Sequence, residues 1–405
     1  MTILPECHRV ALSPRQGYSS SAPMNTNIQE EIFRRTLAHF LRPIQPFLDD
    51  PEVTEVMING PAEIFVERVG KVFRTEAQFE SDLALAAAAR NLAQYTGKRF
   101  GREFPRVDAR LPDGSRVHII TPPASRRGIC IAIRKFSRDV LTIEKLHSCG
   151  AIAPVMSEFL KIAILAEQNI LVSGGTGSGK TTLLNCLSEY IPHDNRVIVI
   201  EDSSELKLRQ SHVLYFEVQR PDRYGKGGVT MRELFHSALR LRPDRIIIGE
   251  IRGGEALDLL QAMTSGHGGS MTTNHANAPE DALRRLETMA LMSNVDMPLT
   301  ALRSQIASAI DVVVQTSRFN DGTRKITHIA EVMPLNEQGN YQLQHLFLYR
   351  ADGEDPKGKV VGRHVWTKSV PAFASSVIGK GLKRFVDLTA PIFRVDERRD
   401  GNASR

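Results

Sequence analysis

A glycine-rich stretch between an apolar strand and an amphipathic helix is the feature that most limits how this chain can fold. The stretch Gly174–Thr182 reads GGTGSGKTT, residues 169–173 before it are mostly apolar, and leucines at helical spacing follow it. Glycines in such a loop let backbone N–H groups turn inward around phosphate oxygens, and the following helix adds the positive end of its dipole. A glycine-rich turn that matched by chance would seldom have both neighbours, so the stretch predicts a phosphate-binding loop.

The side chains of this loop predict how a nucleotide would be held. In loops of this pattern the lysine reaches the β- and γ-phosphates, and the hydroxyl after it binds Mg²⁺. Here these residues are Lys180 and Thr181, so ATP and Mg²⁺ are the predicted cofactors. The predicted nucleotide-binding residues of the loop are Gly174, Gly175, Thr176, Gly177, Ser178, Gly179, Lys180, Thr181 and Thr182.

The chain from 151 to 350 alternates helices with short apolar strands. The strands are expected at 169–174, 196–202, 244–250 and 269–275. Near-continuous apolar strands separated by helices indicate a parallel sheet that is covered on both faces. We therefore expect an α/β fold with a RecA-like P-loop NTPase domain, whose mostly parallel sheet lies between helices.

Residues 28–138 predict a smaller α+β domain in front of this one. Helical spacing from Ile28 gives way to short strands, with turn signals at Asn59-Gly60-Pro61 and Pro112-Asp113-Gly114. The remaining parts are expected to be a disordered leader, a linker and a partly irregular C-terminal extension, at 1–27, 139–150 and 351–405 respectively.

Acidic residues follow two of the predicted strands. Glu201, Asp202 and Glu205 follow one strand, and Glu250 follows another. Ligands of open parallel sheets bind at the carboxyl ends of strands, where a carboxylate can order the Mg²⁺ shell or polarise an attacking water. We predict Glu201, Glu205 and Glu250 as catalytic residues, with Asp202 and Glu250 joining Thr181 at the metal. The alternative is that these acids cap the following helices.

Two histidines stand at the last of these strands. His267 is flanked by glycines, which lets its ring approach a ligand closely, and His275 ends the strand. A neutral imidazole can sense a γ-phosphate, so we predict His267 as catalytic, on the same sheet edge as the acids, and His275 as nucleotide-binding. A hydrogen-bonded core histidine is the alternative for each. A metal pair is disfavoured because no third ligand is near in sequence.

Three arginines are candidates for contacting phosphate. Arg240 and Arg242 precede the strand that ends at Glu250, and Arg134 ends a strand of the N-terminal domain. A guanidinium fork matches phosphate oxygens, and arginine fingers from neighbouring subunits are used in phosphoryl transfer. We predict Arg240 and Arg242 as nucleotide-binding and Arg134 as catalytic. A surface ion pair is the alternative for each of them.

The charge and the cysteine content of the chain limit the cellular location and the partners that we expect for it. The formal net charge of +6 comes without a long block of one sign, so nucleic acid or an anionic membrane surface is permitted but not required. The four cysteines form no CxxC pair, which disfavours a zinc module or a disulfide framework and favours a reducing compartment. We expect neither a signal peptide nor a membrane-spanning run, and therefore a cytoplasmic protein.

Four motifs, in order, resemble those of the type II/type IV secretion ATPase superfamily. They are GGTGSGKT (174–181), IEDSSEL (200–206), GEIRGGEA (249–256) and GHGGSMTTNH (266–275), which are similar to the family's Walker A, Asp box, Walker B and His box. The resemblance implies ATP hydrolysis, a homohexameric ring and the nucleotide-site roles named above for the residues of these motifs. It also implies that Arg134 contacts phosphate.

Outside the ATPase core the chain looks most like the CpaF branch, which drives assembly of tight-adherence (Flp-type) pili. The similar segments are DARLPDGSRV (108–117), IAIRKF (131–136), RFNDGTRKITHIAEV (318–332), LQHLFLYR (343–350) and GKVVGRHVWTKSVPAF (358–373). This resemblance implies inner-membrane platform proteins as partners and a peripheral position on the inner face of the cytoplasmic membrane. The lack of a four-cysteine zinc module separates the chain from the main pilus and type II extension motors.

Other functions fit parts of the sequence. A conjugation or type IV secretion ATPase, or a pilus retraction motor, would share the same core. A RecA-like nucleic-acid translocase belongs to another class, but no basic groove rich in aromatic residues is visible, so nucleic acid is not expected as a partner. A non-catalytic assembly scaffold would show no turnover.

The basic tail allows two interpretations. Apolar residues from Ile378 to Val386, flanked by lysines and an arginine, fit a membrane-surface helix. Gly379 and Gly381 weaken any helix there, so we favour docking on the chain's own domain or disorder.

Overall fold

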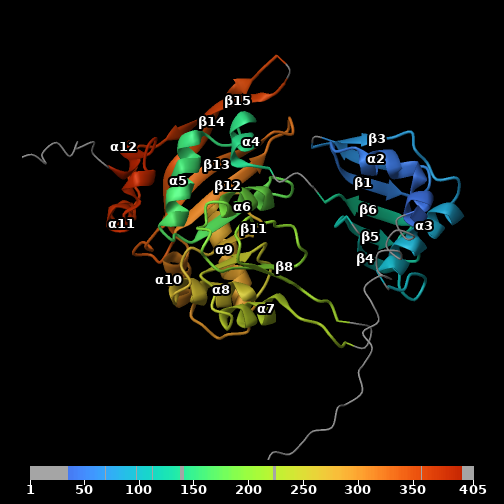
Figure 1. The fold of residues 1–405 in the computed structure, drawn as a ribbon, viewed down its shortest axis with the longest axis horizontal. Helices are drawn as coiled ribbons and strands as arrows, with labels where there is room; N and C mark the ends of the chain where they lie inside the picture. The colour runs from blue at the N-terminus through green and yellow to red at the C-terminus, as the bar shows by residue number, and fades with distance from the viewer. Residues whose placement is uncertain are drawn as a thin grey trace, which may run out of the picture. The chain divides into compact units, whose positions relative to one another are not determined.

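The chain forms two compact units, a first that extends to residue 136 without 69–71 and a second that comprises 69–71 and the chain from 137 on. The computed structural model describes residues 35–68, 70–96, 98–111, 113–136, 141–221, 225–356 and 358–394, and Figure 1 traces the elements along the chain. The predicted leader at 1–27 lies outside the described residues. No helix in these ranges combines the length and the apolar character needed to cross a membrane.

The N-terminal unit is a six-stranded sheet with helices packed on one face. The strand order is β3-β2-β1-β6-β5-β4, and the pairings from β2 through β4 are antiparallel. Alternate residues such as Val56 and Ile58 pack against Leu85, Ala88 and Leu92 of α3. The elements are η1 (Arg42–Ile44), α2 (Gln45–Asp49), β1 (Val53–Asn59), β2 (Ile64–Arg68), β3 (Lys71–Arg74), α3 (Asp82–Tyr95), β4 (Arg106–Arg110), β5 (Arg116–Ile120) and β6 (Cys130–Arg134).

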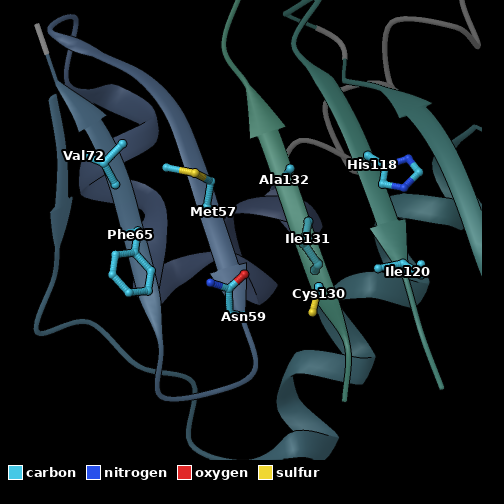
Figure 2. Close-up of a pocket in the computed structure, with 9 residues that line it drawn as sticks. All are labelled: Met57, Asn59, Phe65, Val72, His118, Ile120, Cys130, Ile131 and Ala132. Carbon is cyan, nitrogen blue, oxygen red and sulfur yellow. The ribbon is translucent and has the colours of Figure 1, made fainter. Parts of the chain in front are cut away.

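Among the residues that the structure describes in this unit, no helix covers the other face of this sheet. Figure 2 shows it with the helices behind the strands. A shallow cavity of about 370 Å³ lies on this face, and most of the residues that line it are one position out of step with the core residues. The lining is Met57, Asn59, Phe65, Val72, His118, Ile120, Cys130, Ile131 and Ala132.

The second unit contains a nine-stranded sheet in the order β15-β14-β13-β12-β7-β11-β10-β8-β9. The six strands from β12 to β9 are parallel, and the pairings among β12, β13, β14 and β15 are antiparallel. The strands are β7 (Ile170–Gly174), β8 (Val197–Glu201), β9 (Val213–Glu217), β10 (Arg245–Ile248), β11 (Met271–Asn274), β12 (Val312–Arg318), β13 (Arg324–Met333), β14 (Gln342–Glu354) and β15 (Val360–Trp366).

Helices cover both faces of this sheet, which confirms the predicted α/β fold with a mostly parallel sheet (Figure 1). In β7, Val172 packs into the core beneath α5 and α6, whereas its neighbour Leu171 packs into the core beneath α7 to α10. Burial on both sides explains why the strand sequence is apolar throughout. The helices are α4 (Ile143–Ser148), α5 (Pro154–Leu165), α6 (Lys180–Ser188), α7 (Met231–Leu239), α8 (Glu255–Thr264), α9 (Pro279–Leu291) and α10 (Leu299–Ala309).

Two segment boundaries differ from those expected. The sheet does not end at 350, because that position lies inside β14 and β15 pairs with β14 along its length. Exposed residues on these outer strands hide the alternation that marks a strand in sequence. The predicted linker at 139–150 contains α4, which Thr142 caps by accepting a hydrogen bond from the Lys145 N–H.

The C-terminal segment docks on its own domain rather than standing apart as a membrane-surface helix. Its short helices are α11 (Ala374–Gly379), η2 (Leu382–Phe385) and α12 (Ala390–Phe393). Phe393 stacks on Phe159 of α5, with ring centroids 5.8 Å apart and nearly parallel planes. The neighbouring Glu158 accepts hydrogen bonds from three consecutive backbone N–H groups, at 387–389, and from the Thr389 hydroxyl.

The Glu158 carboxylate makes this docking dependent on pH. Burial alone would raise the pKa of Glu158, but the four hydrogen bonds outweigh it and lower the pKa below the ordinary 4.5. Because the folded pKa is depressed, the contribution to stability is present above pH 4.5 and is lost as the pH falls through the folded value. We expect Glu158→Gln to increase hydrogen exchange at 387–393 at pH 7 and to abolish the acid-side loss of protection. Leu388→Ala, at an exposed neighbour, is the control. Equal exchange in wild type and Glu158→Gln would contradict the assignment.

Candidate nucleotide site

The turn between β7 and α6 has the backbone that the phosphate-loop motif predicts. Gly177 and Gly179 have φ of 69° and 96°, in the left-handed region that favours glycine. Gly179 caps α6 without a side-chain hydrogen bond to the helix start. The first N–H groups of α6 therefore lie where a bound anion would accept from them.

Lys180 lies within this turn and is buried. Its side chain is only 7% exposed, and Nζ donates to the Gly175 carbonyl at 3.0 Å. A buried ammonium at a helix N-terminus fits a phosphate group and little else that is common in cells. The ATP predicted from the motif therefore fits the residues that the fold brings together here.

A continuous chain of polar contacts runs from Lys180 along the carboxyl edge of the sheet. Lys180 Nζ lies 3.4 Å from Nδ1 of His275, and Nε2 of His275 lies 2.9 Å from Oε1 of Glu250. The other Glu250 oxygen accepts from Arg252 Nη2 at 2.8 Å, and Arg252 Nη1 lies 3.4 Å from Asp202 Oδ2. His275, Glu250 and Asp202 thus stand on the edge that the sequence predicts.

The partners of His275 fix its protonation. Burial and the charge of Lys180 lower the pKa of His275 below its ordinary 6.5, although Glu250 opposes them, so the ring is neutral at pH 7. Lysine only donates, so Nδ1 of His275 accepts from Lys180 and Nε2–H donates to Glu250. The ring therefore connects the phosphate-binding cation to the carboxylate without adding a charge.

Glu250 is ionised at neutral pH. Burial alone would raise the pKa of Glu250, but the hydrogen bond and charge of Arg252, together with His275 and Lys180, outweigh it and lower the pKa below 4.5. A carboxylate with a lowered pKa is a weak proton acceptor but a good acceptor of hydrogen bonds from water. This favours a role in orienting an attacking water over full proton abstraction.

Glu201, the last residue of β8, binds the backbone of the loop that contains Glu205. Glu201 is 4% exposed, and its Oε1 accepts from the backbone N–H groups of Glu205 and Leu206 at 2.8 and 3.1 Å. A Cβ at Gly249 would stand 2.9 Å from the Glu201 Cγ, so the absence of a side chain at 249 makes room for Glu201. These contacts order the loop after β8. Catalytic roles for Glu201 and Glu205 remain predictions.

The prediction that His267 shares this edge is wrong. His267 precedes β11, whereas His275 follows it, and β11 runs parallel to β7. The strand rises about 10 Å between its ends. His267 therefore lies at the amino edge of the sheet, where its backbone N–H donates to the Ala262 carbonyl of α8 at 3.2 Å. The Gly-His-Gly pattern indicates a close approach but does not say at which end of the strand it occurs.

Arg240 and Arg242 lie at that amino edge as well, away from the phosphate loop of their own chain, and their binding of nucleotide remains a prediction. Both are exposed and precede β10, whose carboxyl end leads to Glu250. Arg134 belongs to the N-terminal unit, where it stands in register between Glu55 of β1 and Arg116 of β5. Its contact with phosphate remains a prediction.

Two residues of the site were not predicted from the sequence. Arg252 holds both Glu250 and Asp202, and its place two residues after Glu250 was the available signal. Thr316 of β12 is buried against the loop, with Oγ1 2.8 Å from the Ser178 hydroxyl and 2.3 Å from the position of a Cβ at Gly174. Nothing in the sequence connects Thr316 with a loop about 140 residues away.

Protein ligands for a metal are few at this site. In the described ranges no three His, Cys, Asp or Glu side chains gather closely enough to hold an ion by themselves. Mg²⁺ commonly binds through one or two carboxylates together with substrate phosphates and water. The residues present, Thr181, Asp202 and Glu250, fit an ion that is held jointly with a nucleotide.

A mostly parallel sheet with a phosphate loop, a buried lysine and an ionised glutamate at its carboxyl edge defines a P-loop ATPase. The match to known families is consistent with this class. The family described as "Type II/IV secretion system protein" matches residues 38–348. The chain therefore belongs to this family and is an ATP-hydrolysing enzyme.

Curated relatives cover most of this chain. It is 32% identical over 315 residues to the putative conjugal transfer protein Rv3659c of Mycobacterium tuberculosis, which spans 76% of this chain and 88% of the relative. It is 35% identical over 337 residues to the type IV secretion system protein VirB11 of Brucella suis, which spans 75% of this chain and 92% of the relative.

A solved structure has the same fold. The ATPase DotB of Yersinia pseudotuberculosis is similar to the chain with a TM-score of 0.51 at 18% identity. The similarity covers 76% of this chain and 80% of that structure. At this identity the comparison concerns the fold alone.

The role of Glu250 can be tested by removing its charge. We expect Glu250→Gln to lower ATP turnover by about 10²- to 10⁴-fold, the range usual for a lost acid–base or water-orienting group. ATP binding should persist, because Lys180 and the loop are unchanged. Phosphate release and equilibrium ATP binding measure the two effects. Glu337→Gln, at an exposed position, is the matched control. Turnover equal to wild type would exclude a catalytic role for Glu250.

Proposed function

We propose that this enzyme is a Mg²⁺-dependent ring motor of six copies that drives pilus assembly or secretion at the inner membrane. The observation that carries the catalytic part is the contact chain from Lys180 through His275 to Glu250. It connects a phosphate-binding cation to a water-orienting carboxylate on one sheet edge. ATP hydrolysis at that edge would supply the work.

The residues of the site divide the chemistry among them. The N–H groups at the start of α6 and the Lys180 ammonium bind the β- and γ-phosphates and balance negative charge as the bond to the leaving group breaks. Glu250 orients the attacking water, while Arg252 and His275 each hold one of its carboxylate oxygens. The Thr181 hydroxyl, with Glu250 and Asp202 beside it, would hold Mg²⁺, which supplies further charge neutralisation at the phosphates.

A ring of identical subunits would complete this site. Arg134 lies in a separate compact unit, and a guanidinium that reaches phosphate from another unit would make hydrolysis depend on the arrangement of the two units. Such dependence is what a motor needs, because it connects the nucleotide state with relative motion. The family membership supports this proposal.

Pilus assembly of the tight-adherence type is the first candidate for the work done. It is supported by the resemblance of 108–117, 131–136 and 358–373 to the CpaF branch, outside the ATPase core. Platform proteins of the inner membrane would be the partners, and the enzyme would act from the cytoplasmic face. A nucleic-acid translocase has no comparable support.

Conjugation or type IV secretion is the second candidate. It is favoured by the names of two relatives that cover about three quarters of this chain, a putative conjugal transfer protein and a type IV secretion system protein. The site chemistry is the same for both candidates, so only the product of the work can separate them.

Replacing Lys180 tests the enzyme and its cellular role together. We expect Lys180→Ala to lower turnover by at least about 10²-fold, because an interaction with developing phosphate charge is lost. In cells that carry this variant as their sole copy, surface pili counted by electron microscopy should disappear. Lys359→Ala, which removes an exposed lysine, should behave as wild type. Normal piliation with a loss of plasmid transfer would reject the pilus role and support the second candidate.

A further inference from the structure

The hairpin between β12 and β13 lies against the outer side of the phosphate loop. It comprises Arg318–Arg324, and its two end residues are paired in the strand register. The Phe319 N–H donates to the Thr323 carbonyl and closes the turn, and Asp321 accepts from both the N–H and the hydroxyl of Thr323. Nothing in the assigned motifs of the chain gives this hairpin a role.

Arg324 connects the hairpin directly to the loop. Its Nε donates to the Gly177 carbonyl at 2.7 Å, which is short for a hydrogen bond of this type and is assisted by the charge. The Cδ of the same side chain would lie 3.6 Å from a Cβ at Gly179. Arg318 is also close, with Nη1 3.2 Å from the position of a Cβ at Gly177. Two guanidinium groups thus stand beside the tip of the loop.

The hairpin is a rigid support for this contact. Asp321 Oδ2 accepts from the Val360 N–H of β15 at 2.8 Å. On the other side, Lys325 Nζ donates to the carbonyls of Cys149 and Gly150 at 3.3 and 2.9 Å. A side chain held on such a frame can fix the position of its partner, because its own backbone has little freedom to move.

We propose that Arg324 is a positioning residue for nucleotide binding. In a planar trans peptide the C=O and the following N–H point in opposite directions. By holding the Gly177 carbonyl, Arg324 fixes the direction of the Ser178 N–H on the opposite side of the same peptide. That N–H donates to the Gly175 carbonyl at 3.3 Å, the carbonyl that also accepts from Lys180 Nζ, so a phosphate oxygen would take the place of Gly175 for both donors. The residue acts through the loop and requires no contact of its own with nucleotide. The inference rests on phosphate binding at this loop and is independent of what the motor moves.

An arginine suits this task better than a lysine. The Nε–H of arginine has a fixed direction in the guanidinium plane, whereas an ammonium rotates freely and is more strongly hydrated. If only the positive charge of Arg324 mattered, Arg324→Lys would bind nucleotide as tightly as the wild type. Arg324→Lys therefore separates directional support of the loop from simple electrostatics, and Arg324→Gln keeps a polar side chain without the charge.

The test measures ATP and ADP affinity by titration calorimetry on the full chain, in a Glu250→Gln background that limits turnover. We expect Arg324→Ala to weaken both nucleotides by about tenfold, since a charge-assisted hydrogen bond is lost and the loop is shared by both ligands. Arg324→Lys and Arg324→Gln should each recover only part of the affinity. With Glu250 intact, KM should rise while kcat stays within about threefold, because the loop binds ground and transition states alike.

The control is Arg363→Ala, which removes the same charge from an exposed position on β15 and should leave affinity unchanged. Full recovery of affinity in Arg324→Lys, or wild-type affinity in Arg324→Ala, would overturn the proposal. If Arg324→Ala fails to fold, the lysine and glutamine variants still decide between the outcomes. A wild-type chain that binds neither nucleotide would reject the phosphate site itself rather than the role of Arg324.

Discussion

The parallel pairing of β8, β10, β11 and β7 is the constraint on which the site depends. All four strands end at the same edge, so Lys180 and His275 meet although 95 residues separate them. Burial on both faces holds the register, because a slip of one residue would exchange Leu171 and Val172 between two separate cores. The side chains of the site are therefore held as firmly as the sheet itself. The loop that follows each strand contributes one part of the site.

Side chains of opposite charge and a neutral side chain follow one another along this edge. Lys180 is followed by a neutral His275, an ionised Glu250, a cationic Arg252 and then Asp202. Each charge has a partner of the other sign or a neutral spacer, which limits the cost of burying it. The Lys180 ammonium donates a hydrogen bond to the Gly175 carbonyl, and a phosphate oxygen would replace that carbonyl as its partner. Nucleotide binding can then proceed by exchange of hydrogen-bond partners, without leaving a buried cation unpaired.

The sequence predicted those parts of the site that are local in the chain. The phosphate loop, Lys180 and the acid at the end of a strand follow from patterns a few residues long, as do the parallel sheet and its two-sided burial. The error at His267 arises because this residue stands before a strand and not after it, as Arg240 and Arg242 also do. Contacts supplied by β12 and β13 could not be inferred, because strands far along the chain give no signal of which loop they will support. The outer strands β14 and β15 were obscured because the exposed residues along them hide the alternation of apolar and polar residues.

The Lys325 contact with Cys149 and Gly150 has a practical consequence. A thiol reacts as its thiolate. Cys186 is buried, donates to the Leu141 carbonyl at 2.8 Å and has its pKa raised to about 12 by burial, so it is inert at neutral pH. Cys149 is the exposed cysteine of the described ranges. A fluorophore attached there would sit next to the frame that holds the phosphate loop. The native chain thus carries its own attachment point for an optical reporter of nucleotide occupancy.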